Sequence, residues 1–146
     1  FNIAHSGQAV VVALGTTARI GVDVEPLEAP EGEDFELPLD MLASSEQERL
    51  KSLDPATRRI EFIRLWTLKE AYMKANGTGF GQGLDDFQLN WALNLSDQVI
   101  ETGDDRFETR AVELGGRLYQ ISLATESGPA SATWHLWERE NPVERG

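Results

Sequence analysis

The sequence predicts an α+β domain in which a mainly antiparallel sheet packs with a long buried helix. Short β-rich segments recur with local turn signals between them and without βαβ alternation. One helical stretch carries apolar residues nearly all the way round, which is typical of a buried helix. The chain has 146 residues, of which 40% are hydrophobic, and this suits one domain with a real core. We expect that domain to span residues 1–140, with a frayed tail over 141–146.

Six strands are expected from the pattern of β-rich segments. The first two, Gln8–Leu14 and Ala18–Glu25, are predicted to form an antiparallel hairpin around the turn at residues 15–17. The other candidates are Asp86–Leu93, Arg106–Leu114, Leu118–Thr125 and Ala132–Glu138. Gly115 and Gly116 are a turn signal between the middle two of these.

Two helices are expected between the early and late strands, after a loop over Leu27–Asp40. Ser45 followed by Glu48 has the spacing of a capping box and predicts a short helix toward Leu53. The pair Asp54-Pro55 predicts the start of a longer helix, with Asp54 as its N-cap. Gly77 is the natural C-cap, so this helix is expected over Pro55–Asn76.

Composition excludes several classes of function. The formal charge of −12 argues against nucleic-acid binding, which depends on clustered Lys and Arg. No run approaches the roughly 18 consecutive apolar residues that a transmembrane helix needs, so no membrane association is expected. The chain has no cysteine, which suits a reducing cytoplasm and excludes a thiol nucleophile.

The stretch "IGVDVE", Ile20–Glu25, places two carboxylates in a strand that otherwise reads as buried. Asp23 and Glu25 share one face of this strand, with Cα atoms roughly 6.6 Å apart. A polar outer face explains such a pair taken alone. Glu70, however, falls on the buried arc of the long helix, where a carboxylate needs compensation. A pair with Lys74 one turn on explains its spacing but not its burial, whereas three converging acids would form an oxygen site suited to Mg²⁺.

Three segments together resemble a known family. "FNIAHSG" at residues 1–7, "GVDVE" at residues 21–25 and "WTLKEAYMK" at residues 66–74 are similar to motifs of the 4′-phosphopantetheinyl transferases of the surfactin-synthetase-activating type. The glycine-rich "GTGFGQG" follows where that family also has glycines. Three motifs in the right order are far more specific than any one of them.

The resemblance implies a transferase that moves the 4′-phosphopantetheine group of coenzyme A onto a serine of an apo acyl or peptidyl carrier protein. It implies Mg²⁺, or Mn²⁺, held by Asp23, Glu25 and Glu70, with Glu70 also in the position assigned to the base. Lys74 is the better candidate for a phosphate contact. Lys69 points about 100° away, which leaves a coenzyme role and a solvent-facing or tyrosine-covering role both open.

His5 matches the family histidine that contacts a coenzyme A phosphate, expected to be the 3′-phosphate. The residue before it is Ala4, where the family usually has serine, and we therefore expect one phosphate contact to be missing. Carrier domains served by the family are of the fatty acid, polyketide, nonribosomal peptide or aminoadipate reductase type, and the sequence does not choose among them.

Recognition of an acidic carrier by a chain of charge −12 must be local. The basic concentration is at the junction of the two helices, with apolar residues in the loop before it, namely Arg49, Lys51, Arg58, Arg59 and Arg64, and Phe35, Leu37, Leu39, Met41 and Leu42. Because the surfactin-activating type is usually two-lobed, the chain is expected to be one lobe that needs an upstream lobe or self-associates.

Two other classes of function remain open at this point. The first is a degenerate, non-catalytic lobe that binds a metal or a partner without transfer. The second is a metal-dependent phosphohydrolase, which shares the three-acid site but would release inorganic phosphate. The presence of all three acids together with Lys74 favours the transferase.

Overall fold

The computed structural model describes residues 1–28, 37–79, 98–126 and 132–135. In these residues the fold is α+β with antiparallel sheets, as the sequence predicts. The elements are β1 (Asn2–Ser6), β2 (Ala9–Ala13), β3 (Ile20–Pro26), the 3₁₀ turn η1 (Leu39–Met41), α1 (Ser44–Lys51), α2 (Pro55–Asn76), β4 (Gln98–Thr102), β5 (Asp105–Leu114) and β6 (Arg117–Glu126).

The described strands form two sheets, and their pairing corrects one expectation. β1 and β2 form a two-stranded antiparallel hairpin, while β3, β6, β5 and β4 form a four-stranded antiparallel sheet in that order. The predicted hairpin between Gln8–Leu14 and Ala18–Glu25 is therefore wrong. β3 pairs instead with β6, with Asp23 opposite Ser122. The tight turn that the sequence reading missed is at Gly7, which has a φ of 57° and lets β1 return directly into β2.

Local signals explain the helix boundaries. The Asp54 carboxylate accepts a hydrogen bond from the Thr57 amide at 3.1 Å, and Gly77 ends α2 in the left-handed conformation, so both predicted caps of the long helix are confirmed. The predicted capping box of the short helix is wrong. Its N-cap is Ala43, and the Ala43 amide donates to Glu46 Oε2 at 3.1 Å.

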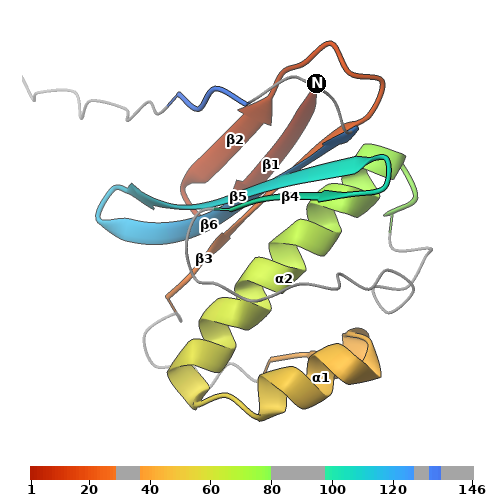
Figure 1. The fold of residues 1–146 in the computed structure, drawn as a ribbon. Helices are drawn as coiled ribbons and strands as arrows, with labels where there is room; N and C mark the ends of the chain where they lie inside the picture. Colours follow the sequence, from red (N-terminus) through yellow and green to blue (C-terminus); the bar gives the residue numbers. More distant parts are fainter. Residues whose placement is uncertain (29–36, 80–97, 127–131, 136–146) are drawn as a thin grey trace, which may run out of the picture.

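The four-stranded sheet is covered on both faces (Figure 1). Helix α2 packs along one face, and α1 lies beside the beginning of α2. The core on the helix side comprises Leu42, Leu50, Phe62, Ile63, Leu65, Leu68, Ala71, Phe107 and Ala124. The core on the hairpin side comprises Ala4, Ala9, Val22, Val24, Tyr119 and Ile121. Strand β3 thus contributes valines to the hairpin side and turns its other face toward α2.

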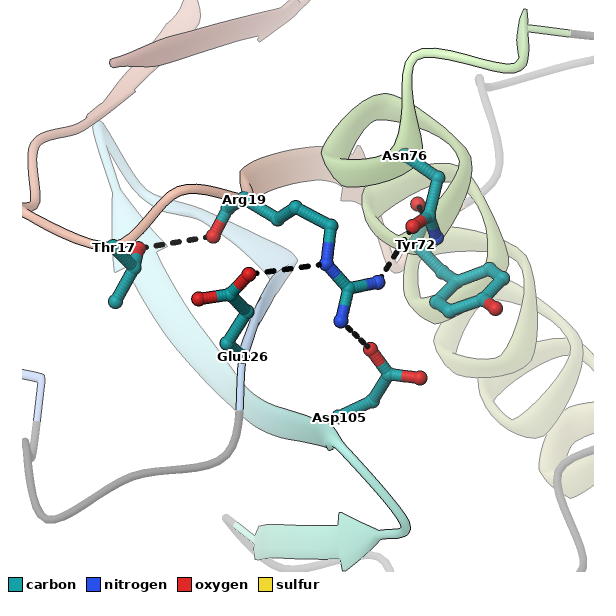
Figure 2. A network of polar contacts seen from close by, with 6 residues as sticks. All are labelled: Thr17, Arg19, Tyr72, Asn76, Asp105 and Glu126. Atoms are coloured by element: carbon teal, nitrogen blue, oxygen red, sulfur yellow. Dashed lines mark hydrogen bonds and ion pairs between the residues drawn. The ribbon is translucent and has the colours of Figure 1, made fainter.

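A polar network around Arg19 ties the end of α2 to the sheet (Figure 2). Arg19 Nη1 donates to Asn76 Oδ1 at 2.6 Å, and Nη2 lies 3.0 Å from Asp105 Oδ1. Its Nε lies 3.5 Å from Glu126 Oε1. The guanidinium of the residue just before β3 therefore joins β5, β6 and the last turn of α2.

Some of the remaining predicted strands match the structure and others do not. Strands β5 and β6 confirm the predicted strands around Gly115 and Gly116. Strand β4 was not predicted. The candidate strand 86–93 and the tail 141–146 lie outside the described residues, and residues 132–135 are not in a strand. None of the helices that the structure describes is both long and apolar enough to cross a lipid bilayer.

Candidate metal and phosphate site between β3 and α2

Strand β3 and helix α2 approach each other at Gly21. A Cβ placed on Gly21 would lie 3.1 Å from the Ala71 carbonyl carbon and closer still to the Ala71 oxygen and the Ala75 amide nitrogen. Gly21 is not among the glycines with positive φ, so close approach, and not backbone conformation, accounts for the glycine here. The missing side chain brings β3 against the part of α2 that carries Glu70 and Lys74.

The predicted site residues on these two elements lie near one another and are largely buried. Asp23 is 6% exposed and Glu70 is 8% exposed, which confirms the expectation that Glu70 lies on a buried arc. Lys74 Nζ lies 2.6 Å from Asp23 Oδ1 and donates to the Val22 carbonyl oxygen at 3.3 Å. The lysine one turn after Glu70 therefore pairs with the strand carboxylate, and not simply along its own helix.

Both buried carboxylates keep an unused oxygen. Among the described residues, Asp23 Oδ2 and Glu70 Oε1 are buried without a hydrogen-bond partner. Burial raises the pKa of Asp23 to about 6, against the effect of Lys74. Burial and the negative charge of Asp23 also raise the pKa of Glu70. Unpartnered buried carboxylate oxygens with raised pKa values favour a site that gains a cation.

Glu25 is the third predicted acid, and a side chain of β1 holds it. Ser6 Oγ of β1 donates to Glu25 Oε2 at 2.8 Å. Glu25 still acts on the pKa values of Asp23 and Glu70. In the part of the chain that the structure describes, no three acidic, histidine or cysteine side chains are gathered closely enough to hold a metal ion as they stand. The donor set nevertheless suits a hard divalent cation, since it is made of carboxylate oxygens of which two are unsatisfied.

His5 lies on the exposed face of β1. It pairs in register with Val10 of β2, and it directly precedes Ser6, the partner of Glu25. Ala4 is 3% exposed and belongs to the core on the hairpin side. The side chain at position 4 thus faces the protein interior and not the surface that carries His5, and the loss of one phosphate contact at Ala4 stays a prediction.

Lys69 occupies a buried position that the sequence reading did not anticipate. It is 1% exposed, so the solvent-facing interpretation is wrong. Its Nζ lies 2.6 Å from Glu46 Oε2, the oxygen that also accepts the Ala43 amide. The pair fixes the start of α1 against α2. Sequence reasoning missed Glu46 because it took Glu48 as the capping residue.

The basic residues near the helix junction separate into two groups. Arg64 is 2% exposed, and Arg58 and Arg59 donate to backbone carbonyls of Leu50 and Leu27. Arg49 and Lys51 are exposed on α1. Of the loop residues, Leu42 is buried and Met41 is 40% exposed, while Phe35 lies outside the described residues. The predicted basic patch is therefore smaller than the sequence suggests.

Comparison with known proteins identifies the family. Residues 19–137 match the model of the 4′-phosphopantetheinyl transferase superfamily. The chain is 31% identical to the 4′-phosphopantetheinyl transferase Sfp of Bacillus subtilis over 71% of the chain and 44% of Sfp. It is 37% identical to the 4′-phosphopantetheinyl transferase HetI of Nostoc sp. over 61% of the chain and 37% of HetI.

A third relative matches more of the chain. The phosphopantetheinyl transferase of Thraustochytrium sp. is 33% identical over 99% of the chain and 55% of the relative. The chain thus spans about half, or less than half, of the length of these relatives. The superfamily match covers strand β3, helix α2 and the rest of the four-stranded sheet. The chain belongs to the 4′-phosphopantetheinyl transferase superfamily.

Proposed function

We propose that this chain transfers the 4′-phosphopantetheine group of coenzyme A to a serine of an apo acyl or peptidyl carrier protein. The observation that carries the proposal is the pair of buried, unpartnered carboxylate oxygens on Asp23 and Glu70 beside the ammonium of Lys74. Family membership agrees with this chemistry. The cysteine-free sequence suits a reducing cytoplasm, where we place the reaction.

The three acidic residues and Lys74 have different roles in the proposed reaction. Asp23, Glu25 and Glu70 would hold Mg²⁺ or Mn²⁺, which supplies charge neutralisation at the pyrophosphate when bound. Glu70, with its raised pKa, is suited to take the proton of the carrier serine, directly or through water. The serine oxygen then forms the new bond to phosphorus, and the bond to adenosine 3′,5′-bisphosphate breaks. Lys74 would hold a phosphate oxygen of the departing nucleotide.

Lys69 and His5 have separate parts in this proposal. We propose that His5 contacts the 3′-phosphate of coenzyme A from the exposed face of β1. A coenzyme contact is one of the roles that the sequence leaves open for Lys69, and its pair with Glu46 favours instead a role in which it holds α1 against the helix that carries Glu70. Exposed Arg49 and Lys51 on α1 then remain available for an acidic carrier.

The test is a carrier-loading assay with coenzyme A, Mg²⁺ and a panel of apo-carriers from fatty acid, polyketide and nonribosomal peptide systems. Mass spectrometry should show the phosphopantetheine mass on a carrier serine. Asp23→Ala and Glu70→Gln should abolish loading while circular dichroism shows an unchanged fold. Near-normal loading by either variant would overturn the metal assignment. Release of inorganic phosphate without loading would favour a phosphohydrolase, and metal binding without either reaction would favour a non-catalytic lobe.

The outer face of the β1–β2 hairpin supports the expectation of association with another protein surface. Its side chains are apolar and exposed, namely Phe1, Ile3, Val10, Val12 and Leu14. Apolar patches of this kind usually mark protein interfaces. We propose that a second copy of the chain packs here, which would place His5 at the interface. Light scattering should detect a dimer that Val12→Asp dissociates, whereas a monomer that becomes active only when extended upstream would contradict self-association.

The part proposed for His5 is tested separately from the chemistry. His5→Ala should weaken the use of coenzyme A more than the use of dephospho-coenzyme A, which lacks the 3′-phosphate. Steady-state loading with both substrates gives the discrimination ratio. The same ratio in the parent and the variant would remove His5 from the phosphate site.

A further inference from the structure

We propose that Lys74 makes the binding of the metal and of coenzyme A cooperative. In the free chain the Lys74 ammonium is the counter-ion of Asp23, and a metal ion at the carboxylates displaces it toward the phosphates of the coenzyme. This inference rests on the proposed function, and it adds to it an order in which the site is filled.

Strand β3 holds the Lys74 ammonium at the edge of the site. Its Nζ lies 2.6 Å from Asp23 Oδ1 and 3.3 Å from the Val22 carbonyl oxygen, so both of these acceptors belong to β3. The Lys74 side chain is 32% exposed, against 9% for the Asp23 side chain. The ammonium is therefore at the outer edge of the site, and a lysine stem with several rotatable bonds can carry it outward without a change in the helix.

Lys74 alone does not satisfy the acidic side chains of the site. Asp23, Glu25 and Glu70 act on one another electrostatically, and Lys74 is the cation that acts on both Asp23 and Glu70. One ammonium cannot satisfy this set, because Asp23 Oδ2 and Glu70 Oε1 have no hydrogen-bond partner among the described residues. A divalent cation at the same oxygens would repel an ammonium held on Asp23. The metal therefore competes with Lys74 for Asp23.

Binding of the metal and binding of the phosphate are linked through Lys74. An ammonium released from Asp23 loses its partner, and an anionic phosphate arriving at the site gives it a new one. A phosphate that draws Lys74 away removes the competitor of the metal. Each ligand then strengthens the binding of the other by the same factor. The direct contact between metal and pyrophosphate adds to this coupling, so Lys74 accounts for a part of it that a variant can remove.

Calorimetric titration of the chain with Mn²⁺, with and without saturating coenzyme A, tests the inference. The parent should bind Mn²⁺ more tightly when coenzyme A is present. Lys74→Met keeps an unbranched side chain and removes the charge. It should bind Mn²⁺ alone more tightly than the parent does, by about fivefold or more, and its gain on adding coenzyme A should shrink by a similar factor. Arg117→Met is the matched control, because Arg117 is exposed at the start of β6 and its loss changes the net charge by the same amount.

The outcomes separate this inference from the proposed function. If Lys74→Met binds Mn²⁺ no more tightly than Arg117→Met does, the competition between Lys74 and the metal is absent and the inference fails. If Glu70→Gln binds Mn²⁺ as well as the parent does, the metal site itself is wrong. If Lys74→Met does not fold, Lys74→Gln takes its place in the same titrations with the same outcomes, and equal Mn²⁺ affinity of the parent with and without coenzyme A would also exclude the coupling.

Discussion

The close approach of β3 and α2 at Gly21 gives a sharp prediction for Gly21→Ala. The added Cβ would meet the Ala71 carbonyl and the Ala75 amide nearer than the 3.0 Å below which real Cβ atoms essentially never come. Both neighbours are backbone atoms of α2, so neither can rotate away as a side chain would. Relief requires helix and strand to separate.

The expected cost combines two opposing effects. Overpacking typically costs 1–3 kcal/mol and occasionally more, and the rigidity of a helix backbone favours the upper end. The loss of glycine freedom in the unfolded chain offsets about 0.4–1 kcal/mol. We therefore expect a net destabilisation of about 2–3 kcal/mol, which corresponds to a decrease in Tm of roughly 5–10 °C for a domain of this size. Separation would also lengthen the 2.6 Å contact between Lys74 and Asp23.

Urea denaturation followed by circular dichroism measures this change. Gly15→Ala is the matched control, since Gly15 also lacks a positive φ and its added Cβ would come no nearer than 3.2 Å, to the flexible end of Ile20. That control should change the free energy of unfolding by less than about 1 kcal/mol. Equal stability of the two variants would refute the interpretation of Gly21 as a close-approach glycine.

Three further predictions concern charged residues. Two of them lie away from the proposed metal ligands, and the third concerns Asp23 in the absence of metal. Arg19→Met removes the network at the end of α2 and should cost about 1–2 kcal/mol in low salt and less in 1 M NaCl, by urea denaturation; equal losses at both salt concentrations would contradict an ionic network. Glu46→Gln removes the negative charge that lies 2.6 Å from the buried Lys69 ammonium and should cost about 3 kcal/mol, most of it recovered in Glu46→Met/Lys69→Met; no recovery would contradict the pairing. In EDTA, Asp23 should lower stability by about 3 kcal/mol as pH rises from about 4 to 6, because the folded chain keeps a proton on Asp23 (pKa about 6) that the unfolded chain has lost; Asp23→Asn should reduce the fall by about that amount and leave the part due to the raised pKa values of Glu70 and Glu61, whereas an unchanged fall would assign the titration elsewhere.

Those parts of the fold that depend on neighbours in the sequence could be predicted. Asp54 and Gly77 are the caps of α2, and Gly115 and Gly116 join β5 to β6, because caps and tight turns are set by a few adjacent residues. The pairing of β3 could not be predicted in this way. Its partner β6 begins at Arg117, and nothing in the local pattern favours that strand over the nearer β2.

The candidate site shows the same division. Strand alternation predicted Asp23 on the strand face opposite Val22 and Val24, and the helical wheel predicted Glu70 on a buried arc, since each argument uses a single element. The contacts between elements were not predictable. Lys69 is buried because Glu46 reaches it from α1, and Lys74 is paired across the interface with β3. Both pairings depend on how elements pack, which periodicity does not encode.

The most direct test of a cation site between β3 and α2 is a crystal structure of the chain with Mn²⁺, located by its anomalous scattering. The proposed site predicts a strong peak within bonding distance of carboxylate oxygens of Asp23 and Glu70, with Glu25 as the third protein ligand and Lys74 moved away from Asp23. It also predicts that this peak is lost in Glu70→Gln. A peak elsewhere, or no peak at a Mn²⁺ concentration that supports carrier loading, would contradict the site.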